Sequence, residues 1–128
     1  MKKFVEVPLN DVTSKIENAW FQTCRERKVP FITVKNKTKY ADVHWDYIAY
    51  PTEVDVILDS LGNQLRDSAI EIFKKYANNK SEYSVNGRLI WYKNLELTKA
   101  ILAAEELYDL IVSCIDDATR SQNKNGIS

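Results

Sequence analysis

The spacing of apolar residues changes along the chain, and each change of period predicts a new secondary-structure element. The short alternation VEV predicts a strand over residues 4–8, which Pro8 ends because proline cannot donate a hydrogen bond to a sheet. Apolar residues then recur at spacings of three and four over residues 12–24. This pattern predicts an amphipathic helix that ends before Pro30.

Residues 31–50 carry β-branched and aromatic side chains on both sides of the polar segment KNKT, which predicts a hairpin with a longer loop. Alternation along the second strand of this hairpin separates two sets of side chains. Val43, Trp45 and Tyr47 would share one face, and Asp42, His44 and Asp46 the other. We expect the polar set to lie on an exposed face of the strand.

An unbroken apolar stripe from Val54 to Tyr76 predicts a single helix, the clearest element in the chain. The stripe keeps a spacing of three and four residues over its whole length, as expected for a helix with one buried side. Asn78 or Asn79 then offers the left-handed conformation in which helices commonly end.

A second hairpin is predicted around Asn86 and Gly87, because both residues of a two-residue type I′ turn must tolerate positive φ. This turn would pair Val85 with Arg88 and Tyr83 with Ile90. One face of the hairpin then carries Tyr83, Val85, Ile90 and Tyr92, and the other carries Leu89 and Trp91. Both faces are partly apolar, so we expect the hairpin to be covered on two sides or to contact a partner.

The last predicted helix begins at Asn94 and ends near Arg120. Its apolar arc is wider than one face of a sheet would bury. We therefore expect this helix to pack on the sheet or on a second subunit, which makes a homo-oligomer through the C-terminal helix the expected assembly. Residues 121–128 lack any pattern and are expected to form a flexible tail.

Together these elements predict an α+β fold with three helices and two antiparallel hairpins in the order β-α-ββ-α-ββ-α. Residues 1–120 would form one globular domain, since the chain of 128 residues has the size of a single ordinary domain. The two cysteines, Cys24 and Cys114, each lie within a helical pattern and far apart, so we expect no disulfide. No apolar run approaches the length of a membrane span, and we expect a cytoplasmic protein.

Charge is unevenly distributed, although the net charge is zero. Residues 1–41 carry nine Lys or Arg against four acidic residues, and the rest of the chain carries nine against fourteen. The stretch RERKVPFITVKNKTK concentrates the cations beside aromatic residues, which predicts a basic and aromatic patch for a partner or ligand. Its candidate residues are Arg25, Arg27, Lys28, Lys35, Lys37, Lys39, Tyr40, Trp45, Tyr47 and Tyr50.

His44 is the single histidine of the chain and lies between two aspartates, Asp42 and Asp46. These three side chains could bind Mg²⁺ or Mn²⁺ in a hydrolase or nuclease, with His44 as a general base. Alternate residues on one strand diverge by about 7 Å, however, so one ion would seldom reach all three. We expect a solvated strand face on which the carboxylates favour the imidazolium form, and no metal or other cofactor.

The remaining motifs of common enzymes are missing from the sequence, including the glycine-rich phosphate loops and the Gly-x-Ser-x-Gly elbow. We therefore predict a non-enzymatic binding protein of the small inhibitor, immunity or phage host-takeover (anti-defence) type, which acts by capturing a protein partner. The alternative is a protein that sequesters or senses a nucleotide or other small anion with the basic and aromatic patch. Duplex DNA is not expected as a partner, because the net charge is zero.

Overall fold

A computed structural model describes residues 2–8, 14–46, 50, 52–86 and 89–127 of the chain. In chain order the elements are β1 (Val5–Pro8), α1 (Ser14–Arg27), β2 (Ile32–Asn36), β3 (Tyr40–Asp46), α2 (Thr52–Ser60), α3 (Gly62–Tyr76), β4 (Glu82–Asn86), β5 (Leu89–Glu96) and α4 (Leu97–Ile127).

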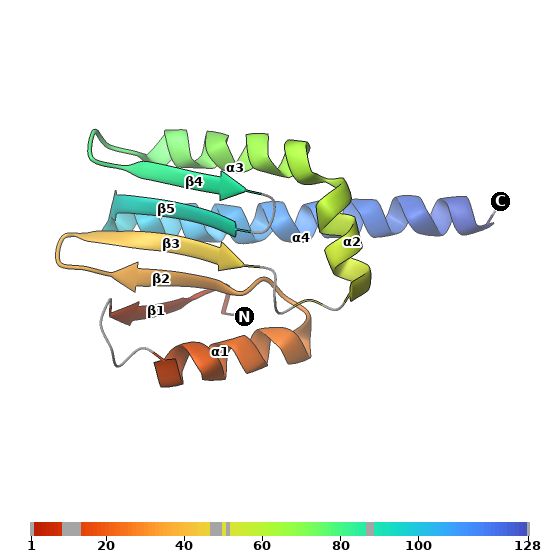
Figure 1. The fold of residues 1–128 in the computed structure, drawn as a ribbon, viewed down its shortest axis with the longest axis horizontal. Coiled ribbons are helices and arrows are strands. Elements are labelled where there is room, and N and C mark those ends of the chain that lie inside the picture. The colour runs from red at the N-terminus through yellow and green to blue at the C-terminus, as the bar shows by residue number, and fades with distance from the viewer. Residues whose placement is uncertain (1, 9–13, 47–49, 51, 87–88, 128) are drawn as a thin grey trace.

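The five strands form one mixed sheet in the order β1-β2-β3-β5-β4. β1 pairs with β2 in parallel, and the other neighbours are antiparallel. In Figure 1, α4 runs behind the sheet, α3 lies along its upper edge and α1 along its lower edge. The predicted α+β class is confirmed, but the described residues form four helices and not three.

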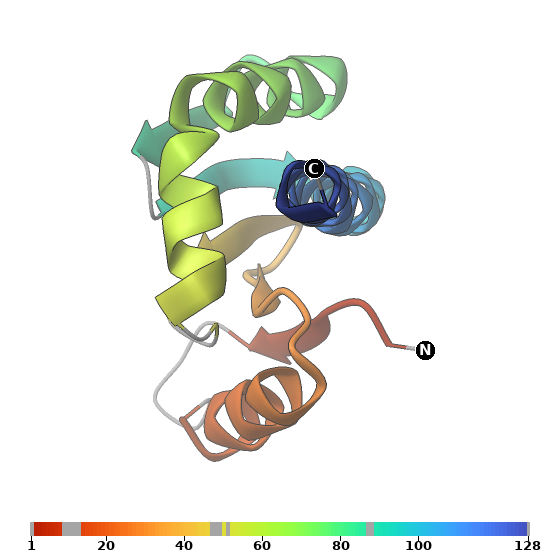
Figure 2. The same cartoon turned by 90° about the vertical axis from the view of Figure 1, so that its right-hand side faces the viewer.

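The two faces of the sheet are covered differently, as the turned view in Figure 2 shows. On one face, α3 and α4 enclose the main core, whose largest fully buried side chains include Trp45, Tyr92 and Leu107. α2 lies beyond the ends of the strands in Figure 1 and adds Leu58 to this core. On the other face, α1 covers β1 and encloses a smaller core of Val5, Val7, Trp20 and Cys24. The Nε1–H of Trp20 donates to the carbonyl of Ile32 at 3.0 Å, which ties α1 to β2.

The prediction of one helix from Val54 to Tyr76 is wrong, because the helix bends at Leu61 into α2 and α3. Leu61 has φ −86° and ψ −3°, which departs from helical geometry, and the next residue is glycine, a weak helix former. The bend keeps the apolar stripes of both helices directed toward α4. An unbroken stripe therefore gave no sign of it.

The predicted register of the second hairpin is also wrong. Asn86 pairs with Leu89 and Val85 with Ile90, so residues 87 and 88, which lie outside the described residues, connect the strands. Each pair differs from the prediction by two positions along β5. A slip of two residues leaves every side chain on its predicted face, so Tyr83 and Tyr92, which pair in the structure, share one face as predicted.

The last helix begins at Leu97 and continues to Ile127, so its predicted ends at Asn94 and near Arg120 are wrong. Asn94 belongs to β5, where its φ of 60° accompanies a bulge. The flexibility of residues 121–128 stays a prediction. α4 packs on the sheet, and no helix in the described ranges is both long and apolar enough to cross a bilayer.

Candidate binding face

One half of the sheet presents a face that no described helix covers. In Figure 1, β3, β5 and β4 lie in front of α4, and no helix of the described residues passes over them on the near side. The pairing of the strands places alternate side chains on this face. We call it the open face, and it consists of His44, Asp46, Glu82, Ser84, Leu89, Trp91 and Lys93, with Lys35 of β2 at its border. At this border the Nζ of Lys35 lies 3.8 Å from Oε1 of Glu17 on α1.

The centre of the open face is an aromatic and cationic cluster of His44, Trp91 and Lys93. His44 pairs with Trp91 across β3 and β5, and their ring centroids lie 5.5 Å apart with a tilt of 58°. The Nζ atom of Lys93 lies 4.4 Å from the centroid of the Trp91 ring, within the range of a cation–π contact. This Trp91 cluster is half-buried, so its rings and its cation border solvent.

Burial lowers the pKa of His44, and the positive charge of Lys35 lowers it further. Asp46 and Glu17 act in the opposite direction but do not outweigh these two effects. The expectation that the flanking carboxylates favour imidazolium is therefore wrong, because desolvation is the larger effect. At neutral pH the cluster carries a neutral imidazole beside two lysines.

The structure separates the cations of the predicted basic patch. Arg25, Arg27 and Lys28 lie at the C-terminal end of α1, Lys35 lies at the border of the open face, and Lys37 and Lys39 lie in the loop between β2 and β3. The first group precedes β2 and the last group follows it, and the two ends of this five-residue strand are about 13 Å apart. The stretch therefore does not form a single basic surface.

Lys28 also has a conformational role at the end of α1. Its φ is 57°, and the N–H of the next residue, Val29, donates to the carbonyl of Cys24 at 3.1 Å. This arrangement is the Schellman motif, in which a left-handed residue, usually glycine, ends the helix. A lysine at this position adopts the left-handed conformation at a steric cost.

The aromatic residues predicted for the patch are also dispersed. Trp45 is 0% exposed and Tyr50 is 7% exposed, so both belong to the core and neither offers a ring face to a ligand. Tyr40 lies at the start of β3, where the Nζ atom of Lys80 is 5.7 Å from its ring centroid. Tyr47 lies outside the described residues. The aromatic ring of the open face is instead that of Trp91.

Asp42, which the sequence placed beside His44 on a solvated face, is buried and has a structural partner. Its side chain is 4% exposed, and its Oδ1 lies 3.1 Å from the Nζ of Lys37 and accepts from the backbone N–H of Asn94 at 3.0 Å. Lys37 also donates to Oδ1 of Asn94 at 2.7 Å. Asn78 and Ser81 donate to the carbonyl of Asn94 at 3.1 Å and 2.9 Å.

This Asn94 network, made of Lys37, Asp42, Asn78, Ser81 and Asn94, joins two loops to the bulge of β5. Asp42 is therefore engaged by contacts within the fold, and its expected place on a solvated surface is wrong. In the part of the chain that the structure describes, no three His, Cys, Asp or Glu side chains gather as metal ligands would.

The cysteines are poor candidates for a nucleophile. Cys24 is fully buried, and burial raises the pKa of its thiol to about 12. Its Sγ–H donates to the carbonyl of Pro30 at 3.4 Å. Burial also raises the pKa of Cys114, which is half-buried on α4. Because the thiolate is the reactive form, Cys24 is held in its unreactive state at neutral pH.

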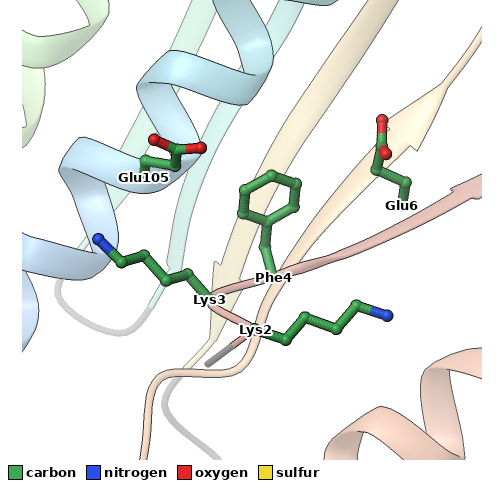
Figure 3. Close-up of a pocket in the computed structure, with 5 residues that line it drawn as sticks. All are labelled: Lys2, Lys3, Phe4, Glu6 and Glu105. Atoms are coloured by element: carbon green, nitrogen blue, oxygen red, sulfur yellow. The ribbon is translucent and has the colours of Figure 1, made fainter.

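A shallow pocket of about 560 Å³ lies away from the open face, between β1 and α4. Figure 3 shows Phe4 in this pocket, with Lys3 reaching toward α4 and Lys2 directed away from it. Lys3 is held by Asp109 of α4, with a distance of 2.9 Å between Nζ and Oδ1. No pattern in the sequence indicated this pocket, because it joins the first residues of the chain to Glu105, which is distant in sequence.

Comparisons with known proteins leave the function open. No protein-family model and no curated protein matches the chain. Among solved structures, the C-Ala domain of Aquifex aeolicus alanyl-tRNA synthetase aligns with 84% of this chain and 89% of that chain, at 9% identity and a TM-score of 0.46. A likeness at this level carries no argument about function.

Proposed function

We propose that this protein is a non-enzymatic binding protein that captures a partner with the open face of its sheet. The observation that supports the proposal is the position of the Trp91 cluster at the centre of a face that no described helix covers. Tryptophan at the centre of an interface commonly contributes a large share of the binding energy. Lys93, whose ammonium lies over the Trp91 ring, adds a positive charge that can pair with a carboxylate of the partner.

A protein surface is the partner that fits this face best. The open face carries both signs of charge, with Lys35 and Lys93 beside Asp46 and Glu82. A nucleic-acid interface would carry mainly positive charge. A mixed polar border around an aromatic centre is the usual composition of a protein–protein interface.

Within this proposal we keep the small inhibitor, immunity or phage host-takeover class, whose members act by occupying a partner's surface. Its support is the size of the chain together with the burial of Cys24, which raises the pKa of this thiol to about 12. Residence in the cytoplasm belongs to the same proposal.

The experiment is affinity capture with the full-length chain immobilised and a lysate of the cells that produce it. We expect a protein retained by the wild type to bind about 30-fold more weakly to Trp91→Ala, as for a central interface residue. Lys93→Glu should weaken binding as well. The matched control is Lys99→Glu, a charge reversal at an exposed position of α4, which should bind like the wild type.

Hydrogen exchange of the purified complex then locates the contact, because the partner should protect β5 and β4 more than α4. If the partner binds Trp91→Ala and the wild type equally well, the open face is not the binding surface. If protection falls on α4 alone, the proposal is also wrong.

A nucleotide or other small anion is the second candidate ligand, and one observation favours it. Lys35 and Lys93 flank His44 and Trp91, so a base could stack on the indole while the lysines meet a phosphate. Titration with ATP, inorganic phosphate and a short DNA duplex tests this candidate. Lys35→Glu combined with Lys93→Glu should abolish ATP binding, whereas Lys39→Glu in the loop should not; duplex DNA should not bind.

A further inference from the structure

The strand β4 is a free edge of the sheet, and it borders the open face. Among the described residues it pairs with β5 alone and is the last strand on its side of the sheet. Its five residues pair with β5 without a register shift. None of the five is the proline or lysine with which proteins often block such an edge. The outer backbone N–H and C=O groups of β4 therefore form a template on which another extended strand can pair.

The exposure of β4 agrees with an edge that lacks a neighbour. Four of its five residues are exposed, whereas β5 has a single exposed residue. Tyr83 packs on Phe73 of α3, with 5.0 Å between the ring centroids, but remains 45% exposed. Tyrosine is enriched at protein interfaces, because its ring is apolar and its hydroxyl group can still form a hydrogen bond. An added strand would cover the exposed part of this ring.

A groove of about 490 Å³ lies between β4 and α3. Its lining consists of one residue of β4 and five residues of α3, namely Tyr83 with Asp67, Ser68, Ile70, Glu71 and Lys74. Figure 1 shows α3 directly beyond β4 at the upper edge of the sheet, so a strand added to β4 would lie against this helix. Its alternate side chains would enter the groove, and the others would continue the open face.

We propose that an extended strand of a protein partner pairs antiparallel with β4 and directs a lysine or arginine side chain into this groove. The inference rests on the proposed function, because the partner is the protein that the open face captures. Antiparallel pairing is the slightly more stable of the two directions. The strand is continuous with the open face, since Ser84 of β4 pairs with Trp91 of β5.

The charges of α3 argue for a cation at the position that faces the groove. Asp67 and Glu71 lie one helical turn apart, and both line the groove. The Nζ of Lys74 lies 3.9 Å from Oε1 of Glu71, so these two charges offset each other. Asp67 has no ion pair among the described residues, so its charge is available to the partner. The aliphatic stem of a lysine or arginine can also pack on the ring of Tyr83.

A second copy of this chain fits the edge less well than a lone strand does. Two β4 strands related by a twofold axis would place that axis about 2.4 Å beyond each strand, half the usual spacing of a sheet. The helix α3 lies at this same edge, with Phe73 against Tyr83 (Figure 1). The axis would pass through or close to α3, and the two copies of the helix would collide. An extended segment of a partner carries no such helix.

Peptide probes test this edge directly, and nuclear magnetic resonance of the isotope-labelled full-length chain reports the binding. The first probe is the capped heptapeptide Thr-Val-Thr-Arg-Thr-Val-Thr, whose alternation places valine and arginine on one face. It should shift the amide resonances of β4 and slow their exchange with solvent, without the same effect on α4. A matched peptide with glutamate in place of arginine should bind about fivefold more weakly, because it places a carboxylate beside Asp67.

The variant Asp67→Lys tests the charge of the groove. Asp67 is exposed on α3, so the variant should remain folded, as circular dichroism would show. The preference should then reverse, so that the glutamate peptide binds more tightly than the arginine peptide. Lys99→Glu is the control, at an exposed position of α4, and should keep the preference of the wild type.

N-methylated peptides test whether the backbone makes the contact. In an extended peptide the N–H groups of alternate residues point to opposite edges, so one set faces β4 and the other faces solvent. N-methylation of one set should abolish binding, and N-methylation of the other should leave it unchanged. An equal response to both sets would overturn the inference, as would the absence of any response of β4 to the arginine peptide at millimolar concentration.

The inference and the proposed function fail separately. If the captured partner is lost with Trp91→Ala but binds Asp67→Lys like the wild type, the open face binds it without strand addition, and the inference is wrong. If the partner responds to Asp67→Lys and not to Trp91→Ala, the strand addition stands and the proposed function is wrong.

Discussion

Asn94 is the residue whose replacement tests most directly how the bulge of β5 is held. Its φ is 60°, a conformation that asparagine and glycine tolerate better than alanine does. Its side chain accepts from Lys37 at 2.7 Å. Asn94→Ala and Asn94→Gly both remove this hydrogen bond, but Asn94→Ala alone adds a methyl group in a left-handed backbone.

The magnitudes follow from these two effects. Loss of the contact with Lys37 should destabilise either variant by about 1 kcal/mol, because the lysine is partly exposed and can be solvated. The left-handed conformation adds about 1 kcal/mol for alanine. We therefore expect Asn94→Ala to lose about 2 kcal/mol and Asn94→Gly about 1 kcal/mol. This order is the reverse of the usual one in a strand, where glycine is the worse residue.

Urea unfolding followed by tryptophan fluorescence measures both variants, with the free energy of unfolding extrapolated linearly to water. Ser84 on β4 supplies the control, since it is exposed and has no positive φ, and there the glycine variant should be less stable than the alanine variant. If Asn94→Ala proves as stable as Asn94→Gly, the left-handed conformation at position 94 does not destabilise alanine, and the reasoning is refuted.

Three further predictions concern single residues. Lys28→Gly should stabilise the fold by about 1 kcal/mol in urea unfolding, because glycine relieves the left-handed conformation at the end of α1. Because the pKa of His44 is lowered in the folded state, unfolding takes up a proton, so the stability of the wild type relative to His44→Gln should fall as the pH drops below about 6.5. Iodoacetamide at pH 8 should leave Cys24 unmodified in the native protein, as peptide mass spectrometry would show, because its pKa is about 12.

Each of these predictions has an outcome that contradicts it. A loss of stability in Lys28→Gly would mean that the lysine side chain contributes more than its backbone conformation costs. If the stability of the wild type relative to His44→Gln instead rises as the pH drops, the imidazolium form of His44 is favoured in the fold. Rapid labelling of Cys24 would mean that the core around α1 opens readily.

Much of the secondary structure could be predicted because it depends on neighbours in sequence. Alternation identified β1, β-branched and aromatic residues identified β2 and β3, and the spacing of three and four identified α1 and most of α4. The face assignment of the second hairpin was correct even though its register was not, since the period of a strand is two. Placing Leu89 and Trp91 opposite the core face was the signal that pointed toward the open face.

The candidate site was harder to predict, because burial depends on which helix lies over which face. Trp45 and Trp91 are both tryptophans in strands, yet the first is buried in the main core and the second lies on the open face beside His44. Asp42 alternates with His44 as a surface residue would, but Lys37 and Asn94 enclose it. Asn94 is far away in sequence, and no local pattern brings it to Asp42.

The sequence by itself determined the elements and the two sides of each strand, since both depend on spacings within a few residues. The tertiary structure alone decided the strand order, the bend at Leu61 and the separation of the basic residues. These features result from the packing of distant segments, chiefly α4 against β2, β3 and β5. The free energy of that packing is shared among many contacts, so no short stretch of the chain records it.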